Sequence, residues 1–298
     1  MKLLRQRTAL VTGGSRGIGF HIAHALVLEG MNVVLTSVSA GELERANNDL
    51  TDCGGKVYSI VANLEDRAAI ESLVSIANSE FGSIDVLINN AGVEKFYAYD
   101  RLSLDDIEYA IRVNLLGSMF LTRLVLPGML QRRLGHIVNM SSLSGKAGPP
   151  CCEPYAATKA GLVAFTESLR AEYTESGVGF SVICPGFVET GIYKRVVEET
   201  GLRVSRLVGT SSADEVAHAV VHAIKMNLPE IIINPGPTRL LTTIAELSPA
   251  LGERLMRLLG VTDWFKNVAA IRESKNPSQC SPQTNETNSA DSNSDDET

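Results

Sequence analysis

Aromatic residues make up only 5% of this 298-residue chain, and it has a single tryptophan. It has no run of about 18 consecutive apolar residues, the length that spans a bilayer, and the apolar part of its first residues is too short to predict a signal peptide. The remaining composition is that of an ordinary globular protein, which excludes collagen-like, coiled-coil and wholly disordered classes.

Positive charge is also in short supply. The net charge is −7, and most of it comes from residues 273–298, where six acidic residues face one lysine. The rest of the chain is nearly neutral and lacks the basic face that nucleic-acid binding requires. Because residues 273–298 are rich in Ser, Asn and Asp and contain no aromatic residue, we predict a disordered acidic tail there.

The five cysteines form neither a CxxC pair nor a zinc-ligand spacing with histidine. An odd number without such spacing argues against a disulfide framework and against a metal site. We therefore expect a reducing, cytoplasmic location. Cys151 and Cys152 are adjacent, and we interpret them as small residues lining a loop rather than as a redox pair, because neighbouring cysteines rarely close a relaxed disulfide.

Short runs rich in Val and Ile alternate with longer amphipathic stretches. Continuous apolar runs are typical of strands buried on both faces, as in a parallel sheet. Strands are expected at 8–12, 32–37, 56–62, 84–89, 136–141, 179–184 and 230–234. Helices are expected at 17–29, 40–52, 66–81, 104–131, 154–176 and 212–226. This alternation predicts an α/β fold of the Rossmann type, a doubly wound seven-stranded parallel sheet in a three-layer α/β/α sandwich.

We expect one domain over residues 1–236, with a helical C-terminal extension over 237–272 and the tail beyond it. Residues 187–211 follow Pro185-Gly186 without a clear strand, which is typical of a substrate lid. In 238–259, leucine and isoleucine recur at helical spacing, with Ser248-Pro249 restarting the helix. That stripe favours packing against the body or a second subunit; contact with a membrane surface is the less favoured alternative.

A glycine-rich turn lies between the first strand and the first helix, with the sequence Thr12-Gly-Gly-Ser-Arg-Gly-Ile-Gly19. A strand that leads through such a turn into a helix is typical of a dinucleotide site, because the helix N-terminus offers free N–H groups to a pyrophosphate. The second strand ends without the acidic residue that would hold a ribose 2′-hydroxyl. Ser37 and Arg16 instead suit a 2′-phosphate, so NADP(H) is favoured and NAD(H) is the alternative.

Candidate catalytic residues follow later in the chain. Tyr155 and Lys159 are four residues apart, which places both side chains on one face of a helix. Ser142 comes just after the fifth strand, at the sheet edge where a cofactor crevice opens. Asn114 interrupts an otherwise apolar helix, and because Asn is a poor helix former its position needs a reason, either functional or a hydrogen-bonded kink.

With these motifs in order, residues 5–235 resemble the classical short-chain dehydrogenase/reductase family. Asn89-Asn-Ala-Gly92 and Pro185-Gly186 followed by Thr190 complete the match. The family places its serine thirteen residues before the tyrosine, which selects Ser142 over Ser141. The resemblance implies a cofactor site formed by Gly13, Ser15, Arg16, Gly17, Ile18, Gly19, Ser37, Asn63, Leu64, Asn90, Ala91, Gly92, Tyr155, Lys159, Pro185, Gly186, Val188 and Thr190.

The resemblance also implies the roles of the catalytic residues. Tyr155 would donate or accept the proton, and Ser142 would bind the substrate oxygen. Lys159 would hold the nicotinamide ribose and, by its charge, lower the pKa of Tyr155. Asn114 would hold a water in a proton relay. The chain departs from the family at Asn63, where many members have Asp, and at Val38, where NADP-preferring members often have Arg.

These observations predict an NAD(P)(H)-dependent oxidoreductase acting on CH–OH donors, which interconverts a carbonyl and an alcohol without a metal. Apolar lining residues favour a lipophilic or acyl-type substrate. The substrate candidates singled out are Ser144, Cys151, Cys152, Phe187 and Tyr193. The alternative is a catalytically silent nucleotide-binding member acting as sensor or scaffold, and the intact Tyr155 and Lys159 argue against it. By the family's habit, a homodimer or homotetramer would form through the helices at 104–131 and 154–176.

Overall fold

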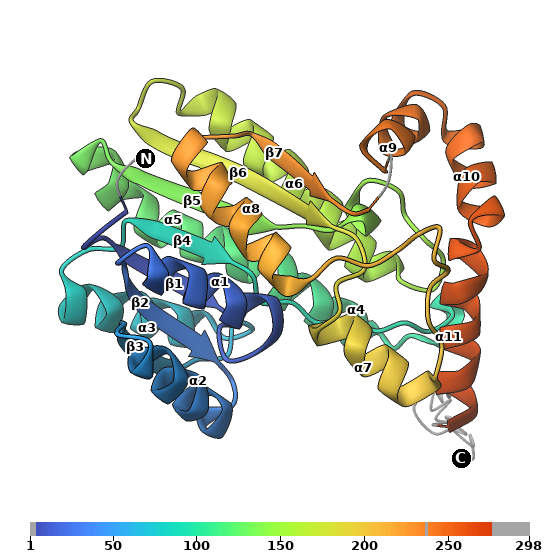
Figure 1. Ribbon diagram of the computed structural model, residues 1–298, viewed down its shortest axis with the longest axis horizontal. Helices are drawn as coiled ribbons and strands as arrows, with labels where there is room; N and C mark the ends of the chain where they lie inside the picture. The colour runs from blue at the N-terminus through green and yellow to red at the C-terminus, as the bar shows by residue number, and fades with distance from the viewer. Residues whose placement is uncertain (1–3, 236–237, 276–298) are drawn as a thin grey trace, which may run out of the picture.

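A wholly parallel sheet of seven strands forms the centre of the computed structural model, which describes residues 4–235 and 238–275 (Figure 1). The strands are β1 (Thr8–Thr12), β2 (Asn32–Ser37), β3 (Lys56–Val61), β4 (Val86–Asn89), β5 (Gly135–Met140), β6 (Val178–Pro185) and β7 (Glu230–Ile233). Their order is β3-β2-β1-β4-β5-β6-β7, so the chain reverses direction across the sheet between β1 and β4. The predicted doubly wound sheet is confirmed, and its crevice opens at the carboxyl ends of β1 and β4.

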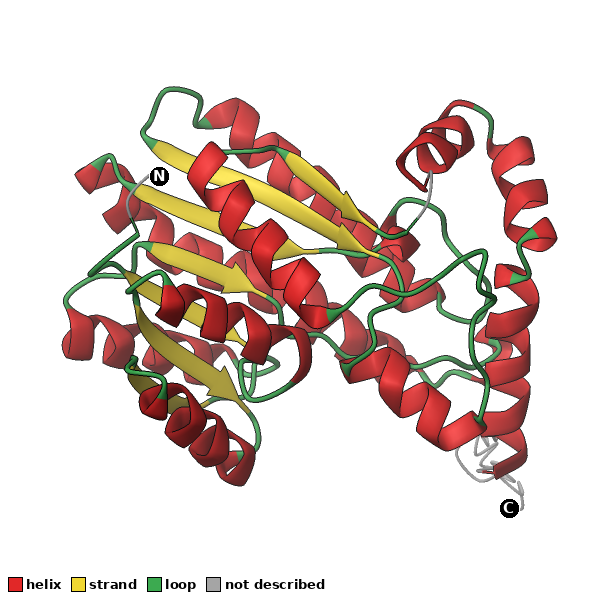
Figure 2. Cartoon of the chain, viewed as in Figure 1, coloured by secondary structure: helices red, strands yellow, loops and turns green. Residues whose placement is uncertain are grey.

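Helices cover both faces of the sheet and make the three layers (Figure 2). The helices are α1 (Gly17–Leu28), α2 (Ala40–Asp52), α3 (Arg67–Phe81), α4 (Leu104–Ile111), α5 (Gly117–Arg132), α6 (Glu153–Glu172), α7 (Gly191–Thr200), α8 (Ala213–Met226), α9 (Thr238–Leu247), α10 (Pro249–Leu258) and α11 (Val261–Lys275). Buried side chains of α1, α2 and α8 pack on one face, and those of α3, α5 and α6 pack on the other. Burial on both faces explains the continuous apolar strands.

A buried polar network fixes two helices against the middle of the sheet. Asn89 Nδ2 on β4 donates to Asn139 Oδ1 on β5 at 2.8 Å and to Thr122 Oγ1 on α5 at 3.3 Å. Asn139 Nδ2 donates to Thr166 Oγ1 on α6 at 2.8 Å. Because a buried amide must find partners, these bonds set the positions of α5 and α6 along the strands.

The single helix expected over 104–131 is broken. A π-helical turn, Arg112–Leu116, separates α4 from α5, and Asn114 lies in it. By length and composition the combined stretch Leu104–Arg132 could cross a membrane, but half of its most apolar window is buried inside the molecule. That burial is typical of a core helix, and the wider turn is the reason an asparagine is tolerated here.

The C-terminal extension lies beyond the carboxyl edge of the sheet, as three helices at the right of Figure 1. α10 begins at Pro249, directly after Ser248, as the Ser-Pro pair indicates. α11 continues to Lys275, so residues 273–275 are helical rather than part of a disordered tail. The rest of the predicted tail lies outside the described residues.

Candidate active site

A cavity of about 850 Å³ runs along the carboxyl ends of the strands. One end is formed by the glycine-rich turn and the other by α7 and the C-terminal extension. Every predicted cofactor residue lines it except Asn63. Asn63 Oδ1 instead accepts a hydrogen bond from Glu65 N at 3.1 Å, a local turn that leaves its neighbours Ala62 and Leu64 at the cavity wall.

The glycines of the turn are required by close contacts. Gly13 and Gly17 have φ of +61° and +58°, which side-chain-bearing residues rarely adopt. A Cβ at Gly19 would lie 2.2 Å from the Gly13 oxygen. α1 then begins with no side-chain cap and no acidic residue in its first turn. Its first N–H groups face a cavity lined by Gly17, Ile18 and Gly19, a donor set that fits a pyrophosphate.

Thr12 and Asn90 join this turn to the end of β4. Thr12 Oγ1 accepts from the backbone N–H groups of Asn90 and Ala91 at 2.9 and 3.0 Å. Asn90 Nδ2 donates back to the Thr12 oxygen at 2.8 Å. The two loops that would flank a nicotinamide nucleotide are therefore held together by hydrogen bonds between side chains and main chain across the topological switch point.

Arg16 has a partner that the sequence reading missed. Its Nη1 lies 3.0 Å from Glu42 Oε1, and Ser15 Oγ donates to Glu42 Oε2 at 3.1 Å. Glu42 stands in the first turn of α2, beyond the end of β2 where an acidic residue was sought and not found. A 2′-phosphate at Ser37 would have to draw Arg16 away from this carboxylate.

The predicted catalytic side chains converge in the middle of the cavity. Tyr155, Ser142 and Lys159 all line it, and Lys159 Nζ donates to the Met140 oxygen at 2.7 Å. The two adjacent serines have different tasks, because Ser141 Oγ donates to the backbone oxygen of Lys159 at 2.7 Å. Both serines line the cavity, but Ser142 Oγ accepts from Ser144 N at 3.1 Å and is hydrogen-bonded to Tyr155. The geometry supports Ser142 as the serine that meets substrate.

The electrostatics differ from the expectation for Tyr155. Burial raises the pKa of Tyr155 above its ordinary value, and the hydrogen bond with Ser142 acts in the opposite direction. The Lys159 ammonium lies 5.5 Å from the tyrosine ring centroid and is engaged by Met140, so the lowering expected from its charge does not appear. Burial also disfavours the charged form of Lys159 and lowers its pKa to about 8.

Asn114 is wholly buried and does not reach the cavity surface. Its Oδ1 accepts from Val93 N at 2.8 Å, and its Nδ2 donates to Val93 O at 2.9 Å and Thr158 Oγ1 at 3.2 Å. Gly92 lies against both Asn114 and Lys159, since a Cβ there would be 3.5 Å from Asn114 Oδ1 and Lys159 Nζ. Asn114 thus fixes the loop after β4 next to Lys159.

At the substrate end, Ser144, Phe187 and Tyr193 line the cavity, but Cys151 and Cys152 do not. Cys152 is fully buried and its Sγ contacts the Pro149 oxygen at 3.4 Å. Burial raises the pKa of both thiols. Cys152 packs behind the lining, in one cluster with Phe96, Tyr193 and Trp264, so a substrate contact for either cysteine stays a prediction.

The sequence reading also missed the wall contributed by the extension. Leu255, Met256, Leu259, Trp264 and Phe265 line the cavity. The helical spacing of the leucines predicted packing, but it did not predict which part of the molecule the helix packs against. Leu247 and Leu258 of that stripe are exposed. The available signal was the Trp-Phe pair in a chain so poor in aromatic residues.

The model of the short-chain dehydrogenase family matches residues 7–201. The chain belongs to this family and is an oxidoreductase of the short-chain dehydrogenase/reductase type. It is 40% identical over 278 residues to the ketoacyl reductase HetN of Nostoc, covering 91% of this chain and 96% of that protein. It is 34% identical over 217 residues to the 3-oxoacyl-[acyl-carrier-protein] reductase FabG of Salmonella typhimurium, covering 72% of this chain and 88% of that one.

Solved structures agree on the fold. An actinorhodin polyketide ketoreductase variant with NADPH has a TM-score of 0.72 at 30% identity and covers 78% of this chain and 97% of its own. A Burkholderia phymatum short-chain dehydrogenase/reductase with NAD has a TM-score of 0.71 at 29% identity, covering 78% and 90%. Residues 1–235, which precede the extension, make up about four-fifths of the chain. A match that covers 91% of the chain, as that to HetN does, must therefore include part of the extension, whereas the other three matches need not.

Proposed function

We propose that this protein is an NADP(H)-dependent reductase that converts a ketone on a lipophilic or acyl-type substrate into an alcohol, and catalyses the reverse reaction when the alcohol is supplied. One observation carries the proposal: Tyr155, Ser142 and Lys159 meet in a single cavity whose far end is the glycine-rich turn. Relatives named as ketoacyl and 3-oxoacyl reductases, and neighbours solved with NADP or NADPH, support the same chemistry.

The residues present fit a nicotinamide dinucleotide. The first turn of α1 would hold the pyrophosphate, Ser37 and Arg16 the adenosine end, and Lys159 the ribose nearest the reaction. When bound, the cofactor supplies or accepts the hydride. Asn114 would help to position Lys159, because its side chain is hydrogen-bonded to the backbone of Val93 in the neighbouring loop.

Proton transfer falls to Tyr155. The phenol of Tyr155 is protonated at neutral pH, as an ordinary tyrosine is, and it would donate that proton to the substrate carbonyl oxygen. Burial raises the pKa of Tyr155 and makes it a weaker acid, so the hydrogen bond with Ser142, which lowers that pKa, favours the transfer. Ser142 beside it would donate a hydrogen bond to the same oxygen and stabilise charge developing there. Assembly of a homodimer or homotetramer through the helices at 104–131 and 154–176 stays a prediction.

The test is oxidation of NADPH, and separately of NADH, with a ketone panel that contains a 3-oxoacyl thioester. We expect turnover with NADPH, and Tyr155→Phe should lower kcat by roughly 10²- to 10⁴-fold while nucleotide still binds. Tyr99→Phe is the matched control, since it removes a phenolic hydroxyl from a side chain that is 58% exposed and does not line the cavity. Turnover that survives in Tyr155→Phe contradicts the mechanism, and nucleotide binding without turnover of any ketone or alcohol favours a silent member.

A further inference from the structure

The C-terminal extension closes the substrate end of the cavity. Leu255, Met256 and Leu259 of α10 and the turn after it line the cavity wall, and Trp264 and Phe265 at the start of α11 continue that wall inward. The 78% coverage of the solved neighbours above does not require them to include this wall, whereas the match to HetN, at 91%, enters the extension. The wall is formed by the same chain that carries Tyr155.

An unbroken series of aromatic contacts connects this wall to the catalytic tyrosine. The ring of Trp264 lies 4.9 Å from Phe265 between centroids, Phe265 lies 5.2 Å from Phe96, and Phe96 lies 6.2 Å from Tyr155. Trp264 also packs on Phe187 of the lid segment at 5.0 Å. Trp264 and Phe265 are only 7% and 4% exposed, so both rings are packed on nearly all sides.

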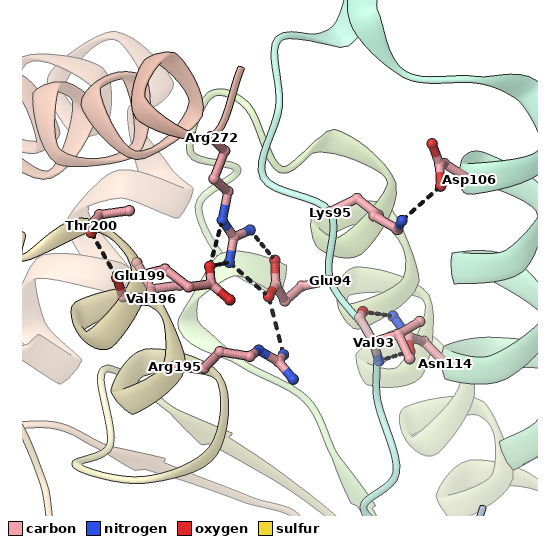
Figure 3. Close-up of polar contacts among 10 residues, drawn as sticks. All are labelled: Val93, Glu94, Lys95, Asp106, Asn114, Arg195, Val196, Glu199, Thr200 and Arg272. Atoms are coloured by element: carbon pink, nitrogen blue, oxygen red, sulfur yellow. Dashed lines mark hydrogen bonds and ion pairs between the residues drawn. The ribbon is translucent and has the colours of Figure 1, made fainter. Parts of the chain in front are cut away.

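Buried charges hold α11 in this position, as Figure 3 shows. Arg272 Nη1 lies 2.9 Å from Glu94 Oε2, and its Nη2 lies 2.7 Å from Glu199 Oε2 at the end of α7. Glu94 also accepts from Arg195 of α7 at 3.1 Å. The side chains of Glu94 and Arg272 are only 2% and 10% exposed. A buried pair of this kind adds little net stability but fixes one arrangement against others, because a displaced partner would be left buried and uncompensated.

The network reaches the catalytic loop directly. Glu94 follows Val93, whose backbone N–H and oxygen both bond to the Asn114 side chain in Figure 3. The Arg272 guanidinium also lies over the Phe96 ring, 5.6 Å from its centroid. One arginine therefore sets the spacing between the loop after β4, the lid helix α7 and the aromatic wall of α11.

We propose that helices α9–α11 select the apolar chain of the substrate, and that Arg272 is the positioning residue for this wall. The lining changes from aromatic rings near Tyr155 to flexible Leu and Met side chains farther out, a surface suited to a linear alkyl or acyl chain attached to the carbonyl. Each additional methylene is buried against α10. The proposal rests on the proposed function, since it places the carbonyl carbon at Tyr155.

Trp264 allows a test that does not depend on turnover, because it is the only tryptophan in the chain. A series of 2-alkanones, from 2-pentanone to 2-undecanone, is titrated without nucleotide while Trp264 emission is recorded. For the native protein we expect Kd to fall about fourfold for each added methylene. Arg272→Gln should flatten this dependence, shift Trp264 emission to longer wavelength, and raise KM for long ketones in the NADPH assay far more than kcat falls.

Three further variants separate positioning from general damage. Arg272→Lys keeps the charge and should restore part of the chain-length dependence. Phe265→Ala keeps the ion network and should flatten the dependence by removing the wall. Arg257→Gln, which breaks an exposed pair with Glu253 on α10, is the matched control and should behave as the native protein.

The outcomes distinguish the two proposals. A native chain-length dependence that is unchanged in both Arg272→Gln and Phe265→Ala, with ketones still reduced, overturns the role of the extension and leaves the reductase standing. Chain-length-dependent binding that these variants abolish, without turnover of any ketone, supports the wall and overturns the reductase. A native protein whose Kd does not change with chain length overturns the wall outright.

Discussion

The two ends of the cavity are held in place by different kinds of contact. The nucleotide end is built from main-chain turns, with Gly13 and Gly17 at positive φ and Asn90 bonded to the backbone of Thr12. The substrate end is built from side chains of segments far apart in sequence, and Arg272 and Glu94 join them through a buried ion pair. A binding site formed by the main chain fits one ligand geometry. The shape of a site formed by side chains can change by substitution while the sheet stays the same.

The strongest way to break the nucleotide end is Gly19→Ala. The new Cβ would lie 2.2 Å from the Gly13 oxygen and 2.5 Å from Asn90 Nδ2, and backbone cannot yield at that distance as a flexible side chain would. We expect a loss of more than about 3 kcal/mol in the free energy of unfolding and at least roughly 100-fold in NADPH affinity. Urea unfolding and NADPH titration measure the two effects.

Gly41→Ala is the matched control for that substitution. Gly41 stands in the first turn of α2, and a Cβ there would meet nothing within 4 Å. The control should be neutral or stabilise by up to about 1 kcal/mol, as expected for Gly to Ala in a helix. Equal NADPH affinity in Gly19→Ala and Gly41→Ala would contradict the prediction, because it would show that the glycine-rich turn accommodates a Cβ at position 19.

Lys159 lies where the two ends meet, and its titration gives a pH test. Its pKa is about 8 in the folded protein against an ordinary 10.5, so between these values the unfolded chain binds the extra proton. The native protein should therefore gain stability relative to Lys159→Met as pH rises from 8 to 10.5, by up to about 3 kcal/mol. Urea unfolding at about pH 7 and about pH 10 measures the difference.

Lys266→Met, at an exposed position of α11 outside the cavity lining, corrects for removal of a lysine in general. A native-minus-variant difference that stays constant with pH would mean that the buried Lys159 has kept the pKa of a solvated amine. A difference that falls with rising pH would reverse the sign of the argument and imply an unrecognised negative partner.

The same contrast explains what could be predicted from the sequence. The sheet, the glycine-rich turn and the meeting of Ser142, Tyr155 and Lys159 were predictable, because strand ends and helix spacing place these residues at one edge. The pairs Glu42–Arg16 and Glu94–Arg272 were not, since exposed and buried charges look alike in a sequence and their partners are separated by 26 and 178 residues. Cys151 and Cys152 show the reverse case, in which nearness to Tyr155 in sequence did not bring them into the cavity lining.

Substitution of Glu42, at the nucleotide end of the cavity, should have the smallest and most selective effect. Its carboxylate occupies Arg16, whose side chain is 65% exposed, so the pair is worth no more than about 1 kcal/mol. Glu42→Gln should release Arg16 toward a 2′-phosphate, tightening NADPH binding by roughly threefold to fivefold and leaving NADH unchanged. Glu44→Gln removes the same charge from the exposed side of α2 and should change neither affinity. If both variants tighten NADPH equally, the effect is one of net charge, and Arg16 has no particular part in choosing the cofactor.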